Sequence, residues 1–215
     1  MIADDMSHAG VEVVDQKHWH SNVELEPDAI ADALLGKVNP SGKLSMSFPQ
    51  NVGQIPVYYN HKNTGRPLTG KWFSKFQSNY IDVSNEPLYP FGFGLSYTSF
   101  EYGAMQVSLN QLKGNQKLKV TIPVKNTGKY AGKEVVQLYI RDEVGTITRP
   151  VKELKGFEKI ELAPGETKEV VFEITTDLLK FHNSDLKFDW ESGDFQIMVG
   201  PNSRDVKAVK VNWVK

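Results

Sequence analysis

The chain has 215 residues, of which 40% are hydrophobic and 11% aromatic, and its formal net charge is −1. This composition can fill a packed core, and the 25 basic residues form no arm or stripe that would attract nucleic acid or anionic lipid. Cysteine is absent, which excludes disulfides and thiolate metal sites, and no apolar run reaches the length of a membrane helix. We therefore expect no nucleic-acid partner and no membrane partner.

Residues 1–23 carry the weakest structural pattern. The first five, Met1 to Asp5, are acidic where a signal peptide is basic and then apolar, so we expect no export signal in the sequence as written. His18 and His20 flank a tryptophan, and His8 lies nearby. A metal site needs three or four converging ligands, which this spacing in an irregular segment does not supply. We expect neither a metal nor a cofactor.

One helix is predicted from Pro27 to Leu35. Proline suits a first helical position, an apolar band follows, and Gly36 can close the helix in the left-handed conformation. Glu24, Glu26 and Asp28 form an acidic cluster, which we interpret as negative charge opposite the positive end of the helix dipole. One helix cannot bury such a band alone, so it needs a partner layer.

Residues 37–99 are rich in turn formers and hold only short apolar pieces. A structureless stretch of this length inside one compact domain is unusual. We interpret it as a long, aromatic-rich connector that lies as a strap across another body. The turn-forming motifs are Asn39-Pro40-Ser41-Gly42, Phe48-Pro49, Ile55-Pro56, Thr64-Gly65-Arg66-Pro67 and Tyr89-Pro90-Phe91-Gly92.

From Met105 onward the hydrophobic period becomes two, which is typical of strands with one buried face. Turn signals separate the runs, and many short strands with regular turns predict a two-sheet β-sandwich. The outward positions are mostly Lys, Glu, Gln and Thr, with Tyr139 as the main exception. The predicted inward faces are Leu118, Val120, Ile122 and Val124; Val136, Leu138 and Ile140; Val170, Phe172 and Ile174; Phe195, Ile197 and Val199; and Val209, Val211 and Trp213.

Several motifs, in order from about Asp28 to the C-terminus, resemble the C-terminal portion of family 3 glycoside hydrolases, in particular its periplasmic β-glucosidases. Residues 1–23 do not share this resemblance. The matching segments are Ala29–Leu44, Ser47-Phe48-Pro49, Val52–His61, Asn63–Pro67, Leu88–Phe100, Val124–Gly128, Arg149-Pro150, Glu153–Phe157 and Leu162–Glu166.

The resemblance implies a mainly β fold, namely an immunoglobulin- or fibronectin type III-like β-sandwich. A helix-containing remnant of an α/β sandwich domain and a long irregular connector precede it. The implied domains are 1–48 for the end of the α/β sandwich domain, 49–99 for the connector and 100–215 for the fibronectin type III-like domain. The family also implies a periplasmic or extracellular location.

The resemblance implies a retaining glycosidase that hydrolyses terminal β-D-glucosyl residues in the complete enzyme. Such a reaction needs a nucleophilic carboxylate and an acid/base carboxyl about 5–5.5 Å apart. In the family both come from regions upstream of Asp28, and no position here matches either. We therefore predict no catalytic residue in this chain and no activity from it alone.

Two other residues outside residues 1–23 invite a functional interpretation. Phe188-Asp189-Trp190 looks superficially like the Asp-Trp pair at the family's nucleophile. Its setting between strand-like segments predicts instead a sheet-edge aspartate beside a packed tryptophan. His182 follows Phe181 at a predicted strand end and is interpreted as structural.

Asn60, His61 and Arg66 are the candidate substrate-binding residues. Their segment combines amide, imidazole and guanidinium donors with turn formers and neighbouring aromatics, which suits the rim of a sugar site. The simpler alternative is that Arg66 pins the connector to a neighbouring domain through backbone carbonyls.

Two functions remain open from the sequence. The chain is either the structural, non-catalytic end of a β-glucosidase-like hydrolase or a free-standing β-sandwich module that binds carbohydrate or protein. A decayed gene product is a third possibility. The first predicts an exposed apolar surface in the N-terminal half. The expected partners are then the catalytic domains of a parent enzyme or a second copy of the chain, with a possible β-glucoside contact.

Overall fold

The computed structural model describes residues 27–66 and 76–215, and the predictions on residues 1–23, on Glu24 and on Glu26 lie outside them. The chain divides into two compact units between Val38 and Asn39. The domain boundaries predicted at 48 and 99 stay predictions. No helix in the described residues has the length and apolar character needed to cross a membrane.

The predicted helix is present as α2 (Pro27–Leu34) in the first unit. Gly36 follows with a φ of 72°, and its N–H donates to the carbonyl of Ala33 while the N–H of Lys37 donates to Asp32. These bonds satisfy carbonyls that the helix end leaves open, and only glycine adopts this φ without strain. Leu34 and Leu35 are exposed, so the apolar band predicted from the sequence faces outward.

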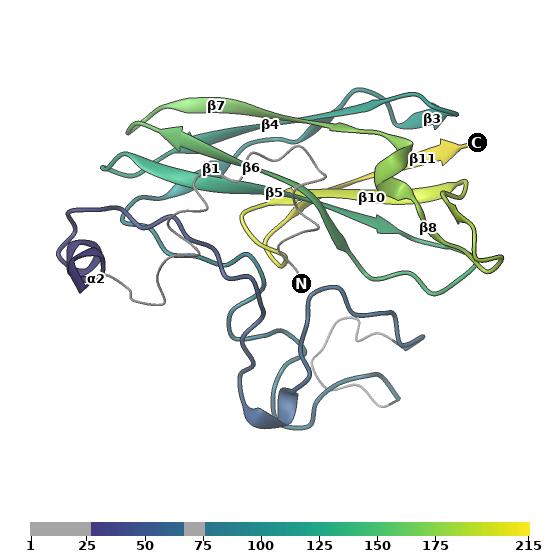
Figure 1. Ribbon diagram of the computed structural model, residues 1–215, viewed down its shortest axis with the longest axis horizontal. Helices are drawn as coiled ribbons and strands as arrows, with labels where there is room; N and C mark the ends of the chain where they lie inside the picture. The colour runs from purple at the N-terminus through teal and green to yellow at the C-terminus, as the bar shows by residue number, and fades with distance from the viewer. Residues whose placement is uncertain (1–26, 67–75) are drawn as a thin grey trace. The chain divides into compact units, whose positions relative to one another are not determined.

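The sandwich predicted from residue 100 onward is present and confirms the mainly β fold class (Figure 1). In the described residues one sheet pairs β4 with β1 and β2 on one side and β7 on the other, and the second runs in the order β3-β11-β10-β5-β6. The strands are β1 (Phe100–Tyr102), β2 (Gln106–Val107), β3 (Gln111–Lys113), β4 (Leu118–Asn126), β5 (Gly132–Asp142), β6 (Glu153–Leu162), β7 (Thr167–Ile174), β10 (Gly193–Gly200) and β11 (Lys207–Val214).

Short elements lie outside the two sheets. β8 (Phe181–His182) and β9 (Phe188–Asp189) form a separate hairpin. The 3-10 helix η3 (Thr176–Leu179) precedes it, and a second 3-10 helix, η2 (Val52–Gln54), lies in the connector. The hairpin closes the end of the sandwich at which its C-terminal strand finishes, because Lys215 pairs with Asp189 of β9.

The core lies between the two sheets. The predicted inward faces are buried, apart from Val209, which is half-buried. Each such Val, Ile or Phe contributes about 1.5–3 kcal/mol relative to an exposed side chain. The turn at 163–166 connects the sheets: Gly165 has a φ of 79°, and the Glu166 carboxylate accepts from the Ala163 N–H at 2.7 Å. Alternating apolar residues and specific turns therefore produce the sandwich.

Strand β5 departs from simple alternation because it is buried on both faces. Tyr139 is fully buried, and Gln137, on the same outward face, is 3% exposed. Glu134, at the start of the inward series, is 4% exposed. Tyr139 does lie on the outward face, as predicted, but the expectation that this face is exposed to solvent is wrong at Tyr139. The side chain points away from the sandwich core, but the connector covers it.

From here on we use the name connector for the described part of residues 39–99, which is longer than the predicted 49–99. Its own backbone pairing holds it together. Phe48 and Tyr89 form an antiparallel bridge, with N–H to carbonyl distances of 2.8 and 3.3 Å. Further along, the Leu44 N–H donates to Phe93, and the Gly92 N–H donates back to Leu44, both at 2.8 Å. The two arms of the connector thus run side by side, as the lower part of Figure 1 shows.

Gln54 organises the tip of the connector. It is fully buried, and its carboxamide oxygen accepts from the Gln50 N–H at 2.7 Å. Its nitrogen donates to the carbonyls of Ser84 and Glu86 at 3.0 and 2.9 Å. The Tyr80 hydroxyl donates to the Gln54 carbonyl at 2.8 Å. One amide side chain therefore replaces the hydrogen bonds that regular secondary structure would supply.

An aromatic and amide cluster fixes the connector on the outer face of β5. Tyr59 stacks on Phe91 with ring centroids 4.3 Å apart and meets Tyr139 edge-on at 5.7 Å. The Tyr139 hydroxyl donates to Gln137, whose nitrogen donates to the carbonyls of Gly92 and Pro201 at 3.2 and 2.6 Å. Aromatic pairs in these geometries add about 0.5–1.5 kcal/mol beyond their buried area.

A buried ion pair makes a second attachment. Lys43 Nζ lies 3.1 Å from both carboxylate oxygens of Glu134 on β5, and the Tyr102 hydroxyl donates to one of them at 2.9 Å. The Lys43 and Glu134 side chains are 15% and 5% exposed. Burial, and then the neighbouring carboxylate, raise the pKa of the Tyr102 phenol, so it remains a hydrogen-bond donor.

We predict that Glu134→Ala lowers the free energy of unfolding by about 3 kcal/mol, because it leaves a buried ammonium group without its partner. Glu173→Ala is the matched control, since Glu173 pairs with Lys117 at 2.7 Å but is 58% exposed. That loss should be about 0.5 kcal/mol. Urea unfolding followed by tryptophan fluorescence measures both, and equal small losses would contradict the buried attachment.

We also predict that Gly92→Ala destabilises the chain more than Gly165→Ala does. Both glycines have a φ near +80°, so both alanines carry similar backbone strain, about 1–2 kcal/mol. A Cβ at Gly165 meets nothing within 4 Å, whereas one at Gly92 overlaps the Gln137 carboxamide. Moving that carboxamide breaks buried hydrogen bonds at a further cost of about 1–3 kcal/mol. Thermal melting of the two variants compares them, and identical melting temperatures would refute the clash.

Candidate functional site

The candidate sugar-contacting residues lie on a segment that we call the rim loop, residues 60–66. Asn60, His61 and Arg66 are all exposed. Side chains fix the loop locally: the Gly65 N–H donates to Asn63 Oδ1 at 3.0 Å, and the Arg66 carbonyl accepts from the Ser78 N–H at 2.8 Å. Such turns present donor side chains to solvent on a defined backbone.

A concave surface beside the rim loop brings His61 together with residues from a second segment. Its volume is about 450 Å³. Of the three predicted residues, His61 lies in its described lining, and Asn60 and Arg66 do not. The lining residues are Pro56, Val57, Tyr58, His61, Lys62, Thr64, Ser78, Asn79, Tyr80 and Asn85.

The composition of this cavity suits a polar ring such as a sugar. Tyr58 and Tyr80 supply aromatic surface, and Tyr58 meets the His61 ring edge-on at 6.4 Å. Asn79 and Asn85 supply amides that hold the loop as well: the Asn85 Nδ2 donates to the Ser78 carbonyl at 2.8 Å. A small number of polar groups on an aromatic surface is the usual make-up of ligand sites.

Asn79, Tyr80 and Asn85 were missed by the sequence analysis. They follow the rim loop by more than a dozen residues in an irregular segment, where no periodicity predicts which side chains face the loop. The link is the pair of bonds between the loop and Ser78, one from its N–H to Arg66 and one from its hydroxyl to Thr64 Oγ1 at 2.8 Å. Trp72 and Phe73, the other aromatics near the loop in sequence, lie outside the described residues.

Tyr58 and Tyr59 point to opposite sides of the connector backbone, Tyr58 to the cavity and Tyr59 to the sandwich. Tyr59 is only half-buried but accepts a hydrogen bond from the Leu154 N–H at 3.3 Å and packs against the sandwich. Burial raises the pKa of its phenol, an effect that the bond from Leu154 partly offsets. The extended backbone thus directs one tyrosine to the cavity and the next to the sandwich.

The catalytic look-alike at Phe188-Asp189-Trp190 lies at the β8–β9 hairpin, and contacts within the sandwich hold its side chains. Asp189 ends strand β9, and its carboxylate pairs with Lys215 and accepts from the Trp190 N–H. The bond from Lys215 is the main cause of the lowered pKa of Asp189. Trp190 is buried against Trp213. His182 is exposed and lies against Phe188 with ring centroids 5.0 Å apart.

A second hollow, of about 290 Å³, lies beside the Lys43–Glu134 pair. Both charged groups there already bond to each other, and Tyr102 donates to the same carboxylate. The two charged groups of this hollow are therefore already paired with each other. Within residues 27–66 and 76–215, no group of three or more His, Asp or Glu residues is placed to hold a metal ion.

Comparison with known proteins accounts for both halves of the chain. Residues 19–97 match the glycosyl hydrolase family 3 C-terminal domain, and residues 134–203 match the fibronectin type III-like domain. The match begins at residue 19, a few residues before the point at which the sequence motifs become recognisable.

The similar proteins are glycosidases. The periplasmic beta-glucosidase of Salmonella typhimurium is 50% identical over 189 residues, which cover 88% of this chain and 25% of that protein. A beta-xylosidase of Formosa agariphila is 45% identical, with 90% and 26% covered. The crystal structure of a beta-glucosidase from Listeria innocua in complex with glucose has a TM-score of 0.80 at 47% identity and covers 86% of this chain and 26% of that one.

The chain belongs to glycoside hydrolase family 3 and corresponds to the C-terminal part of its β-glucosidases, including the fibronectin type III-like domain. It spans about a quarter of the length of the relatives it matches. The resemblance seen in the sequence motifs is confirmed.

Proposed function

We propose that the chain is the structural, non-catalytic end of a β-glucosidase-like enzyme and that it covers and stabilises a catalytic body. The observation that carries this proposal is the two-sided connector. One side packs on the sandwich through Tyr59 and Phe91, and the other is apolar and exposed. A surface of the second kind is typical of an interface.

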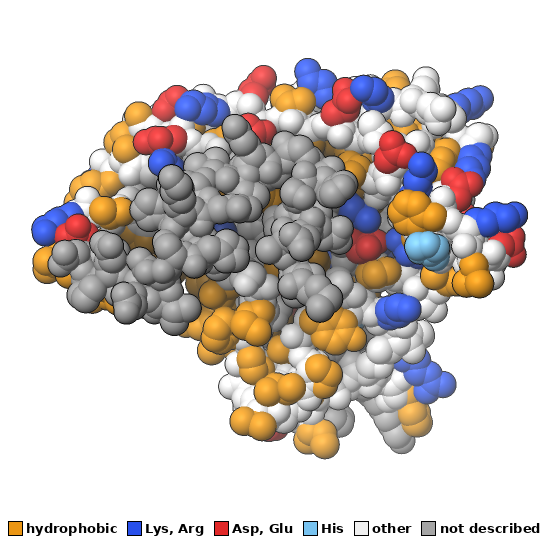
Figure 2. Space-filling model, in the orientation of Figure 1, with side chains coloured by type: hydrophobic (Ala, Val, Ile, Leu, Met, Phe, Trp, Pro, Cys, Tyr) orange, Lys and Arg blue, Asp and Glu red, His pale blue; other side chains and the backbone are white. Residues whose placement is uncertain are grey.

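The exposed side of the connector has the composition expected of a surface that binds another protein. Figure 2 shows hydrophobic side chains gathered over this part of the molecule, in the lower part of the view. Val52 and Ile81 are 84% and 85% exposed. The other exposed members include Met46, Phe48, Ile55, Tyr58, Phe76, Leu88 and Tyr89. The proposed occupant is the catalytic body of a parent enzyme, and a second copy of the chain is the alternative.

The rim loop would then lie at the edge of the sugar site in the complete enzyme. Asn60, His61 and Arg66 are proposed to contact the β-glucoside, with Tyr58 and Tyr80 as stacking surfaces. The relatives include both beta-glucosidases and a beta-xylosidase, so the proposed substrate class is a terminal β-linked neutral sugar, with glucose as the first choice. A periplasmic or extracellular location is proposed from the periplasmic relative.

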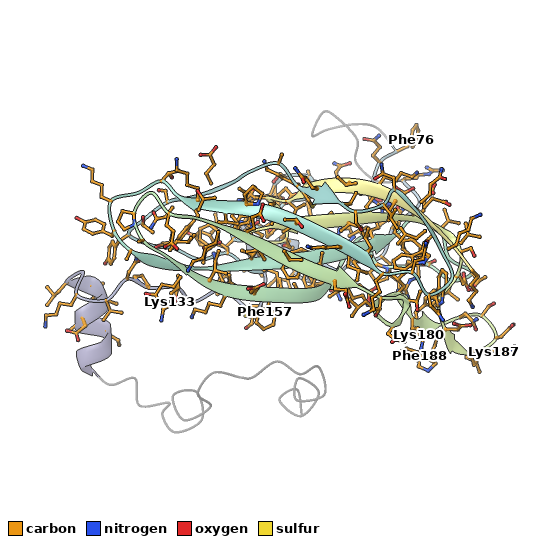
Figure 3. The ribbon with its side chains drawn as sticks, turned by 90° about the horizontal axis from the view of Figure 1, so that it is seen from above. Phe76, Lys133, Phe157, Lys180, Lys187 and Phe188 are labelled. Atoms are coloured by element: carbon orange, nitrogen blue, oxygen red, sulfur yellow. The ribbon has the colours of Figure 1, made fainter. Side chains whose placement is uncertain are left out.

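The alternative of a free-standing sugar-binding module receives little support from the surface of the sandwich. A dedicated binder gathers exposed aromatics on one face. Phe157 is near the middle of β6, whereas Phe188 is at the end of the sandwich beside Lys180 and Lys187, and Phe76 lies elsewhere on the connector (Figure 3). This scatter provides no continuous stacking platform.

We predict that the purified chain releases no product from a chromogenic β-glucoside above the buffer rate. No residue of the chain matches the family's nucleophile or acid/base position, and without that carboxyl pair the reaction has no efficient route. Turnover that disappears when one Asp or Glu of this chain is replaced would overturn the proposal.

To test the interface, this chain is co-expressed with the Salmonella relative from which the matching C-terminal quarter has been removed. We expect the two polypeptides together to recover hydrolysis that neither has alone. The double variant Val52→Lys/Ile81→Lys should lose this recovery without a change in the melting temperature of the chain itself, because both side chains are exposed. Tyr130→Lys, at a 62% exposed position on the sandwich, is the control. Equal recovery with all variants argues against this surface.

The rim role is tested with Arg66→Ala in a chimera, in which this chain replaces the matching quarter of the Salmonella relative. A lost charged hydrogen bond to the sugar is worth about 1.5–3 kcal/mol, so KM should rise roughly tenfold or more with kcat nearly unchanged. Lys117→Ala removes a 62% exposed cation that pairs with Glu173 on the sandwich, and it should change neither. A lower melting temperature with unchanged kinetics would instead support Arg66 as a pin for the connector.

A further inference from the structure

The rim loop is joined to the sandwich through one short backbone contact. The Val151 N–H donates to the His61 carbonyl at 2.9 Å, and Lys62 forms an antiparallel bridge with Pro150. Both partners lie on residues 143–152, the loop between β5 and β6, which we call the support loop. The support loop therefore fixes the start of the rim loop, while Ser78 holds its other end.

Arg149 is the most connected side chain of the support loop. Its Nη2 lies 2.8 Å from Glu153 Oε2, and its Nε lies 3.6 Å from Asp142 Oδ2. Its guanidinium carbon lies 3.9 Å above the centre of the Phe181 ring. The side chain is 11% exposed, and these three partners come from β6, β5 and β8. One residue before Pro150, it connects the loop to three strands.

The chemistry of this position suits arginine and no other cation. A planar guanidinium can stack on an aromatic ring while its edge faces two carboxylates, whereas an ammonium group is a point charge that cannot do both. Asp142 needs the cation as well. Burial raises the pKa of this carboxyl, and the charge of Arg149 opposes that rise.

We propose that Arg149 is a positioning residue for the rim loop: it fixes the support loop, which in turn holds His61 and its neighbours at the edge of the sugar site. The sugar contact rests on the proposed function, whereas the mechanical link between Arg149 and the rim loop does not. The sandwich then does more than stabilise the parent enzyme, because it sets the geometry of a substrate-contacting segment.

The mechanical link is tested in this chain by native-state hydrogen exchange. Arg149→Met keeps an unbranched side chain over Phe181 but removes the positive charge and the guanidinium N–H donors. We expect exchange of the Val151 amide to accelerate at least tenfold, while the amides between β10 and β11, such as Val211, stay within twofold. Arg149→Lys should give nearly the same acceleration, and Lys117→Met, at a 62% exposed position on the sandwich, should give none. An unchanged Val151 amide overturns the proposal, as does equal acceleration of all amides, which would indicate a purely global effect.

The sugar contact is tested separately in the chimera with the Salmonella relative. With Arg149→Met we expect KM for the β-glucoside to rise severalfold and kcat to stay within twofold, the same pattern as Arg66→Ala. If Val151 exchange accelerates and KM does not change, Arg149 still positions the loop, but the loop does not contact sugar. Hydrogen exchange at Val151 thus tests the positioning of the loop, and KM in the chimera tests its contact with the sugar.

Discussion

The burial of strand β5 on both faces is the constraint on which the rest of the structure depends. Its inward side chains fill the sandwich core, and its outward side chains Gln137 and Tyr139 lie beneath the connector. A polar group buried without a hydrogen bond costs about 1–3 kcal/mol. The connector helps to satisfy these groups, because the Gly92 carbonyl accepts from Gln137, which in turn accepts from Tyr139. Lys43 of the connector also pairs with Glu134 at the end of the inward face. The connector has few strand pairings of its own, and its contacts with the outer face of β5 hold it in place.

This arrangement links the fold to the proposed function. Because the inner side of the connector is committed to β5, its apolar outer side is free for a catalytic body. The same commitment places Tyr59 on the sandwich and Tyr58 at the cavity beside His61. The support loop adds a second fixed point. A β-sandwich outside the proposed catalytic body can in this way influence how a sugar is bound.

Much of the fold could be predicted from the sequence, since alternation along each strand and glycine at position 36 have direct physical meaning. The covering of β5 was missed because alternation identifies an inner face but does not reveal whether the outer face meets water. The available signal was the uncharged run from Val135 to Ile140, which is typical of a strand buried on both sides. Asn126 is a similar case. Asn126-Thr127-Gly128 is a turn signal in the sequence, and the Gly128 N–H does donate to Asn126 Oδ1. The signal does not reveal that Asn126 is also buried and bonds to Thr98, Tyr130 and Leu162. Of the candidate site, the rim loop was identifiable from composition, but its partners at Asn79 and Tyr80 depend on irregular backbone that has no period.

The coupling free energy between Tyr59 and Tyr139 tests most directly whether the connector and the sandwich form one cooperative structure. It is obtained from the unfolding free energies of Tyr59→Leu, Tyr139→Leu and the double variant. The account predicts a coupling of about 1 kcal/mol, as expected for a buried aromatic pair. A loss in the double variant that equals the sum of the two single losses within about 0.3 kcal/mol would contradict this prediction. It would mean that the connector can leave β5 without a cost to the sandwich.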